Sequence, residues 1–219
     1  MEIIEKVKCF VKTRLEDEIT GHDWWHSYRV WQMALHIAET EKESCDILVV
    51  QISALLHDVW DWKFLKSSET PGTLAKIWLL EQNVSDYIAN SVCNIIDEIS
   101  FKGAGTPNFL GSLEGKIVQD ADRLDALGAI GIARTFAYGA YKNRQIYNPD
   151  IKPIYHTSFE DYKNYRGTTV NHFYEKLLLI KDKLNTETAK KIAAKRDAFM
   201  KTFLDQFFQE WELDVAPEK

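Results

Sequence analysis

The sequence predicts an all-α fold, and three observations support that prediction. Apolar residues recur at helical spacing, residues that favour helix starts precede these runs, and no long alternating strand pattern occurs. The length of 219 residues lies slightly above the usual size of one domain. We therefore expect a single helical-bundle domain over residues 1–219, with one long irregular loop at about 139–167 and C-terminal helices after it.

Five helices are expected in the first half of the chain. The first carries an apolar stripe, the second holds His26, and the third runs through the apolar stretch ILVVQISALL to His57. That stretch alone also suits a buried strand, but its length and the histidine–aspartate pair after it favour a helix. The expected starting residues of the later helices are Asp23, Ser44 or Asp46, Thr70 followed by a proline, and Ser85.

The second half is expected to begin with a Gly- and Pro-rich loop at 102–111. One long helix should follow from Leu113 to about Tyr138, where Gly128 suggests close packing or a bend. Two helices, at about 168–183 and 186–213, should follow the irregular region. The aromatic stripe of the last helix is expected in the core and consists of Phe199, Phe203 and Phe207.

Composition excludes several classes of function. A net charge of −6 argues against a general nucleic-acid binder, which needs a basic face. The charged N-terminus does not resemble a secretory signal, and no apolar run reaches the roughly 18 residues that span a bilayer. The three cysteines are widely separated, which favours reduced thiols. We expect a cytoplasmic protein without a nucleic-acid or membrane partner, whose aromatic residues would allow a homo-oligomer.

Histidines and aspartates at three places form the main chemical signal: His26 in GHDWWHSYRV, His57 and Asp58 in ALLHDVWD, and Asp122 in VQDADRLDAL. Two imidazoles and two carboxylates make a mixed nitrogen and oxygen ligand set for one divalent metal. The set lacks thiolate, which favours Mn, Fe, Co or Ni, with Mg entering together with the substrate. Such an ion would make water a nucleophile at neutral pH.

Other polar residues are candidates for assisting roles. Asp61 would share a face with the metal pair if the helix continued, and could be a general base or the partner of Lys63. His22, four residues before His26, could donate a proton, bind phosphate or simply begin a helix. The candidate phosphate-binding residues are Lys63, Arg123, Arg144, His172 and Lys176. Arg123 could instead orient a neighbouring aspartate, and His172 and Lys176 could be a solvated face.

Tyrosines in and beside the long irregular region could stack a base or a sugar, although packing is the alternative. They are Tyr141, Tyr147, Tyr155 and Tyr165.

The histidine and aspartate motifs resemble those of the HD-domain metal-dependent phosphohydrolase superfamily, and the surrounding segments resemble its small bacterial nucleotide pyrophosphohydrolase-like group. This resemblance implies an all-helical HD-type hydrolase domain that holds a metal through His26, His57, Asp58 and Asp122. The chain has HDVWD where the guanosine-tetraphosphate hydrolases have HDxxED, so Asp61 stands where that group carries an acidic residue. Substrate identity transfers poorly within a fold family.

The preferred hypothesis is hydrolysis of a (deoxy)nucleoside triphosphate by a metal-activated water, with release of pyrophosphate. Two alternatives stay open: a phosphatase for nucleoside monophosphates or other phosphate esters, and a nucleotide-binding regulatory module with weak turnover.

Overall fold

A computed structural model describes residues 2–41, 43–60, 69–99, 110–154 and 167–213. Within these ranges every regular element is a helix, which confirms the all-α prediction. The helices are α1 (Glu2–Arg14), α2 (Trp24–Thr40), α3 (Ile47–Leu56), α4 (Pro71–Glu81), α5 (Asp86–Ile99), α6 (Leu113–Asp125), α7 (Gly128–Tyr141), α9 (Asn171–Glu175), the 3₁₀ helix η2 (Leu177–Lys183) and α10 (Glu187–Trp211).

The helix starts follow from local capping, as expected. Asp23 accepts a hydrogen bond from the amide of His26 at the start of α2, and Asp46 accepts from two amides of α3. Thr70 caps α4 in the same way, with proline as the first helical residue. These caps satisfy amides that have no partner inside the helix. The position of His26 in the first turn of α2 is therefore fixed by a hydrogen bond that the sequence itself encodes.

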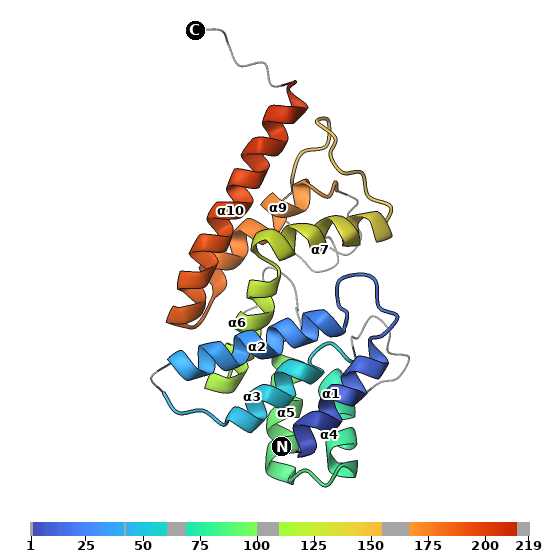
Figure 1. Cartoon of the computed structure of the whole chain (residues 1–219), viewed down its shortest axis with the longest axis vertical. Helices are drawn as coiled ribbons and strands as arrows, with labels where there is room; N and C mark the ends of the chain where they lie inside the picture. Colours follow the sequence, from blue (N-terminus) through green and yellow to red (C-terminus); the bar gives the residue numbers. More distant parts are fainter. Residues whose placement is uncertain (1, 42, 61–68, 100–109, 155–166, 214–219) are drawn as a thin grey trace.

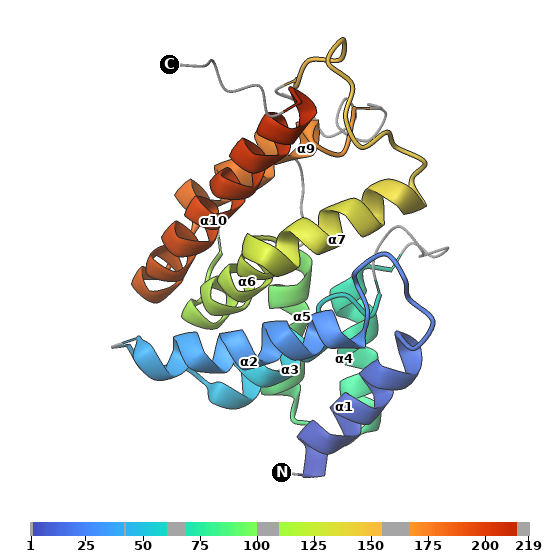
Figure 2. The ribbon, with the colours of Figure 1, turned by 45° about the horizontal axis from the view of Figure 1, so that its top comes forward.

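The helices form two groups joined by α2 and α6. Figure 1 shows α1, α3, α4 and α5 at one end of the molecule and α7, α9 and α10 at the other. Helix α2 packs on both α3 and α6 (Figure 2), and α3 also contacts α5 and α6. Helix α3 is the most buried of these, since seven of its ten residues are inaccessible to solvent. The meeting point of α2, α3 and α6 is thus the place where distant motifs come together.

The long helix expected from Leu113 to about Tyr138 is wrong in one respect: it is two helices. Helix α6 ends at Asp125, and α7 starts at Gly128 in a new direction (Figure 1). Gly128 has a φ of +74°, a conformation that costs a residue with a Cβ free energy. A Cβ there would also lie 3.1 Å from Cγ of Arg196 on α10. The bend that this glycine suggests is therefore a complete break between two helices.

The helix expected at 168–183 is also divided. Lys176 has a non-helical backbone between α9 and η2, and the residues after it form a 3₁₀ helix. Leu177 and Ile180 are the buried residues of this segment. Their spacing of three places them on one side of a 3₁₀ helix, which has three residues per turn. The final helix, by contrast, begins at the predicted cap, where Thr186 accepts from the amide of Ala189.

The predicted core stripe of α10 is wrong for Phe199, which is 52% exposed. Phe203 and Phe207 do pack against the core. Residues four apart on a helix advance by about 40° around its axis, so a stripe at this spacing turns away from one face. The buried residues next to the stripe are Met200 and Leu204.

The irregular region begins later than expected, because α7 extends to Tyr141. Residues 142–154 have no regular structure, and Tyr147 packs edge-on against Trp211 of α10 with ring centroids 4.9 Å apart. Tyr155 and Tyr165 lie outside the described residues, as does most of the loop expected at 102–111. Of the four tyrosines, Tyr147 therefore has a packing role, and Tyr141 is a half-exposed residue at a helix end.

Candidate metal centre

The structure brings together the four residues that the sequence singles out. His26 lies in the first turn of α2 and is fully buried. His57 is the residue directly after α3, and Asp58 follows it in the turn. Asp122 lies on α6, and its side chain is 41% exposed. Donors from three helices thus converge at one point that is open to solvent on the side of Asp122.

The donor atoms lie at distances that suit a common ion. Nε2 of His26 is 3.2 Å from Nε2 of His57, 3.2 Å from Oδ2 of Asp58 and 3.4 Å from Oδ1 of Asp122. Nε2 of His57 is 3.5 Å and 3.7 Å from the same two oxygens. Metal–ligand bonds of about 2.1 Å separate neighbouring donors by about 3.0 Å at a right angle and about 3.4 Å at the tetrahedral angle. The observed distances lie within about 0.3 Å of the tetrahedral separation, so the donors are close enough to share one ion.

The hydrogen bonds on the far side of each imidazole support the same conclusion. Nδ1 of His26 lies 2.7 Å from Oδ2 of Asp125, and Nδ1 of His57 lies 2.9 Å from the carbonyl oxygen of Ala54. Both partners accept hydrogen bonds, so each Nδ1 carries the proton and each neutral ring presents an Nε2 lone pair. Two lone pairs that face each other at 3.2 Å repel unless a proton or a metal ion lies between them.

The electrostatics of the cluster favour protons on its imidazoles. Burial and the charge of Arg134 act to lower the pKa of His26, but hydrogen bonds to Asp122, Asp125 and Asp58 raise it to about 10. Against burial, the charge of Asp58 and the carboxylate of Asp122 raise the pKa of His57.

The carboxylates respond in the opposite direction. Burial acts to raise the pKa of Asp58, but the charges of His57 and His22 hold it well below its usual range. Hydrogen bonds from His26 and His57 do the same for Asp122. Two ionised carboxylates and two imidazoles could hold a divalent cation with its charge balanced.

His22 joins the site from the loop before α2. Its Nδ1 lies 2.6 Å from Oδ2 of Asp58, and about a third of its side chain is exposed. Glu18 holds this loop, because its carboxylate accepts from the hydroxyl and amide of Thr20 and from the amide of His22. The sequence indicates His22 through its spacing from His26, but gives no sign of the part that Glu18 plays.

A second layer of polar residues lies behind His26. Asp125 accepts from His26 and from two arginines, Arg29 on α2 and Arg134 on α7. Burial opposes ionisation, but these donors hold the pKa of Asp125 below its usual range. Sequence reasoning missed the functional context of these three residues. Asp125 follows Asp122 by three residues and Arg29 follows His26 by three, a spacing that places each pair on one helix face.

The predicted substrate-binding residues have other contacts or lie outside the described ranges. Arg123 donates a hydrogen bond to the carbonyl oxygen of Lys183, which ties α6 to η2. Burial and the charges of Lys176 and Arg144 lower the pKa of His172 to about 3, so these three form an electrostatic group around α9. Asp61 and Lys63 fall in the range 61–68, which is not described.

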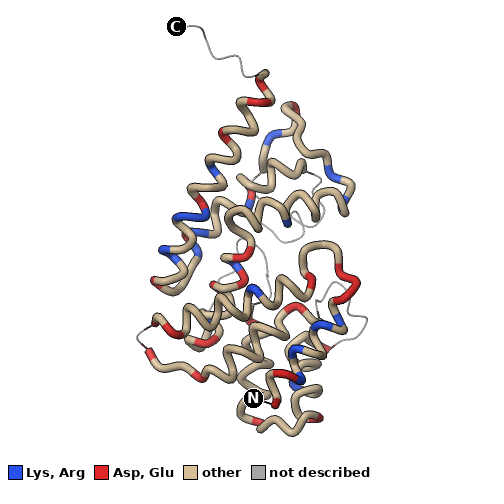
Figure 3. The backbone as a smooth tube through the Cα atoms, in the orientation of Figure 1, with Lys and Arg blue, Asp and Glu red and all other residues tan. Residues whose placement is uncertain are grey.

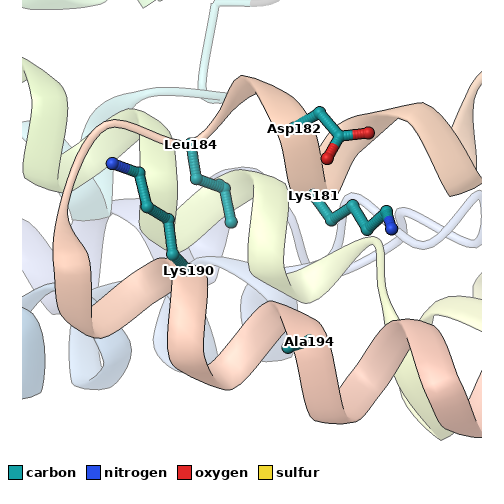
Figure 4. Close-up of a pocket in the computed structure, with 5 residues that line it drawn as sticks. All are labelled: Lys181, Asp182, Leu184, Lys190 and Ala194. Atoms are coloured by element: carbon teal, nitrogen blue, oxygen red, sulfur yellow. The ribbon is translucent and has the colours of Figure 1, made fainter.

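Basic residues gather on the first half of α10 and on η2 (Figure 3). A surface pocket lies between these two helices (Figure 4), and acidic residues are close to its lysines. Lys190 pairs with Glu187 at 2.8 Å, and Lys181 lies 3.8 Å from Asp197. The pocket is lined by Lys181, Asp182, Leu184, Lys190 and Ala194. Within the described ranges no helix combines the length and apolar character needed to cross a bilayer.

Comparisons with known proteins agree with this geometry. The model of the HD domain family matches residues 24–127, a range that contains all four clustered residues. The chain is 36% identical over 208 residues to YpgQ of Bacillus subtilis, which is described as uncharacterized; the match covers 92% of this chain and 90% of that protein.

Solved structures of similar proteins share the fold. An HD-superfamily hydrolase from Bacillus thuringiensis is 43% identical, with a TM-score of 0.74 and coverage of 96% of this chain and 97% of that one. A protein from Lactobacillus plantarum is 37% identical, with a TM-score of 0.84 over 97% and 98% of the two chains. A structure of Bacillus subtilis YpgQ in complex with ADP is 31% identical in its structural alignment, with a TM-score of 0.71 and 98% coverage of both chains.

Proposed function

Because the chain belongs to the HD-domain family of metal-dependent phosphohydrolases, we propose that it hydrolyses a (deoxy)nucleoside triphosphate and releases pyrophosphate. The observation that carries the proposal is the convergence of His26, His57, Asp58 and Asp122. We assign these four residues as ligands of one divalent transition metal. Their nitrogen and oxygen donors, without thiolate, favour Mn, Fe, Co or Ni.

The two histidines and two aspartates would hold the ion and keep it accessible to the substrate. A bound divalent ion supplies Lewis acidity, which lowers the pKa of water and polarises a phosphoryl oxygen. The two imidazoles and two carboxylates hold that ion at the partly exposed side of α6. In the neutral ring of each histidine, the hydrogen bond from Nδ1 keeps the ring proton on that atom. The lone pair of Nε2 is therefore available to bind the ion.

We assign His22 the role of moving a proton or binding a substrate oxygen. Asp58 engages Nδ1 of His22, so Nε2 is the ring atom left to meet a substrate. Hydrogen bonds from the loop amides of Thr20 and His22 to the Glu18 carboxylate keep the ring next to the cluster. The predicted roles of Asp61 as general base and of Lys63 as a phosphate ligand rest on the sequence alone.

A nucleotide is the favoured class of substrate because YpgQ, which aligns along nearly the whole chain, has been solved in complex with ADP. That complex supports binding of a base, a ribose and a diphosphate by a protein of this fold. For this chain we keep the cations Arg123, Arg144, His172 and Lys176 as candidate substrate contacts, to be tested singly.

A panel of nucleotides and phosphate esters tests the proposal. The protein is stripped of metal, each divalent ion is added in turn, and the products are separated by chromatography. A nucleoside monophosphate and pyrophosphate from a triphosphate support the preferred reaction. Orthophosphate from a monophosphate supports the phosphatase alternative, and tight nucleotide binding without turnover supports the regulatory module.

Variants test the ligand assignment. His57→Ala and Asp58→Ala should lose metal and turnover while keeping their helical circular dichroism. His36→Gln is a matched control, since His36 is an exposed histidine on the same helix as His26. If the two folded ligand variants kept their metal content and their turnover, the proposal would be abandoned.

A further inference from the structure

Asp125 is a buried carboxylate whose hydrogen-bonding capacity is filled by cations and by one imidazole. It is 4% exposed. Oδ1 accepts from Nε of Arg29 at 2.7 Å. Oδ2 accepts from Nη2 of Arg29 at 2.9 Å, from Nη1 of Arg134 at 2.9 Å and from Nδ1 of His26 at 2.7 Å. Every partner in this set donates a hydrogen bond, and Asp125 accepts all of them as an ionised carboxylate.

We propose that Asp125 is a positioning residue that fixes the tautomer and orientation of His26 and thereby sets the affinity of the site for its ion. This inference rests on the proposed function, because it assumes that His26 binds metal. A carboxylate oxygen at Nδ1 requires the ring proton on Nδ1, which leaves Nε2 as the donor toward the ion. Arg29 and Arg134 hold the carboxylate in place from α2 and α7.

The Asp125→Asn substitution has a specific consequence in this setting. An amide keeps one accepting oxygen and gains a donating nitrogen. Three of the four donors, His26 among them, point at Oδ2, so the amide oxygen is expected at that position and the amide nitrogen opposes Nε of Arg29. The neutral amide accepts more weakly from Nδ1 of His26 than the carboxylate does, so it holds the ring less firmly and makes Nε2 a weaker ligand for the ion. The variant is therefore expected to lose metal affinity by 10- to 100-fold, the usual effect of removing a partner of a metal-bound histidine.

The chain offers a matched control on the same helix. Asp120 is also buried on α6, and its oxygens accept from the amide and side chain of Asn185 and from the amide and hydroxyl of Thr186. It anchors the start of α10, and none of these partners is a histidine. Asp120→Asn should therefore lower the melting temperature and leave the metal dissociation constant within about threefold of the wild-type value.

A second control separates the imidazole contact from the ionic network. Arg29→Met removes both hydrogen bonds from Arg29 but leaves the contact between Asp125 and His26. It should lower stability and weaken metal affinity less than Asp125→Asn does, because Asp125 keeps its contact with His26. If Asp125→Asn does not fold, the double variant Arg29→Met/Asp125→Asn, in which the charge change is balanced, is measured instead and judged by the same criterion.

The experiment is a titration of metal-free protein with Mn²⁺ alone, by calorimetry or by competition with a metal-binding dye, together with a melting curve for each variant. A 10- to 100-fold weaker affinity in Asp125→Asn, with Asp120→Asn within about threefold of wild type and a smaller loss in Arg29→Met, supports the proposal. An unchanged affinity in Asp125→Asn, or an equal loss in Asp120→Asn, overturns it. Failure of the wild-type protein to bind any divalent ion would instead remove the proposed function.

Discussion

Metal binding should release protons, because the site holds protons when the ion is absent. The pKa of His26 is about 10, and that of His57 is raised by the same carboxylates. At pH 7 His26 therefore carries a proton on Nε2 that an ion must displace. His57 contributes a second proton to a smaller extent, because the charge of His26 acts to lower its pKa. Asp58 and Asp122 are already ionised and contribute none.

The expected release at pH 7 is about one to two protons per ion, and the affinity should rise by about 10- to 100-fold per pH unit between about pH 6 and 8. Calorimetric titration with Mn²⁺ in buffers of different ionisation enthalpy measures the number directly. The His36→Gln control should release as many protons as wild type. A release of zero protons at pH 7 in each buffer would refute the electrostatic reasoning about the two imidazoles.

Three further predictions concern stability. A free ion concentration of 100 times the dissociation constant should stabilise the fold by about 2.7 kcal/mol, or raise the melting temperature by roughly 5–11 °C, and a scan with and without chelator measures this. Gly21→Ala should lower the free energy of unfolding in urea by about 1–2 kcal/mol and should lower turnover. Gly21 has a φ of +92°, and a Cβ there would meet Arg134 beside the His22 loop. An unchanged free energy of unfolding and unchanged turnover would contradict this prediction. The pKa of His172 is lowered to about 3, so below about pH 6.5 the unfolded chain binds a proton that the folded protein does not. The free energy of unfolding should therefore fall as the pH drops from about 6.5 to 3. His172→Gln should flatten this pH dependence, and identical pH profiles for the two proteins would contradict the reasoning.

Local signals in the sequence predict most of the helix starts. Asp23, Asp46 and Thr70 cap helices through hydrogen bonds to amides two or three residues away, so the relevant contact is encoded within one turn. The clustering of His26 with Asp122 was predictable for a different reason. Their residue types and surrounding motifs indicate one chemical function, and that function requires them to be close.

The break between α6 and α7 could not be derived from the sequence in the same way. A glycine inside a helical pattern costs about 1 kcal/mol, which is too little to decide between a helix and a turn. The positive φ of Gly128 is selected by packing against Arg196, which lies far away in the sequence. The partners of Asp125 depend on this break, because Arg134 approaches from the helix that begins after it.

The break in the helix at Lys176, between α9 and η2, has a similar origin. The run LLLI after it has no helical period of its own, and the choice of a 3₁₀ helix depends on which leucines the neighbouring α10 can cover. Phe199 illustrates the same limit. An aromatic stripe at a spacing of four residues does not predict how far the neighbouring helices extend along α10, so the exposure of Phe199 could not be predicted.

The three helices that meet at the candidate centre are far apart in the order of synthesis. The histidines and Asp58 leave the ribosome early, whereas Asp122 and Asp125 follow only after more than half of the chain has been made. A nascent chain can therefore offer at most three of the four proposed donors until α6 folds onto α2. Loading of the ion would then be a late step in the biogenesis of the protein, and truncated translation products would be released without it.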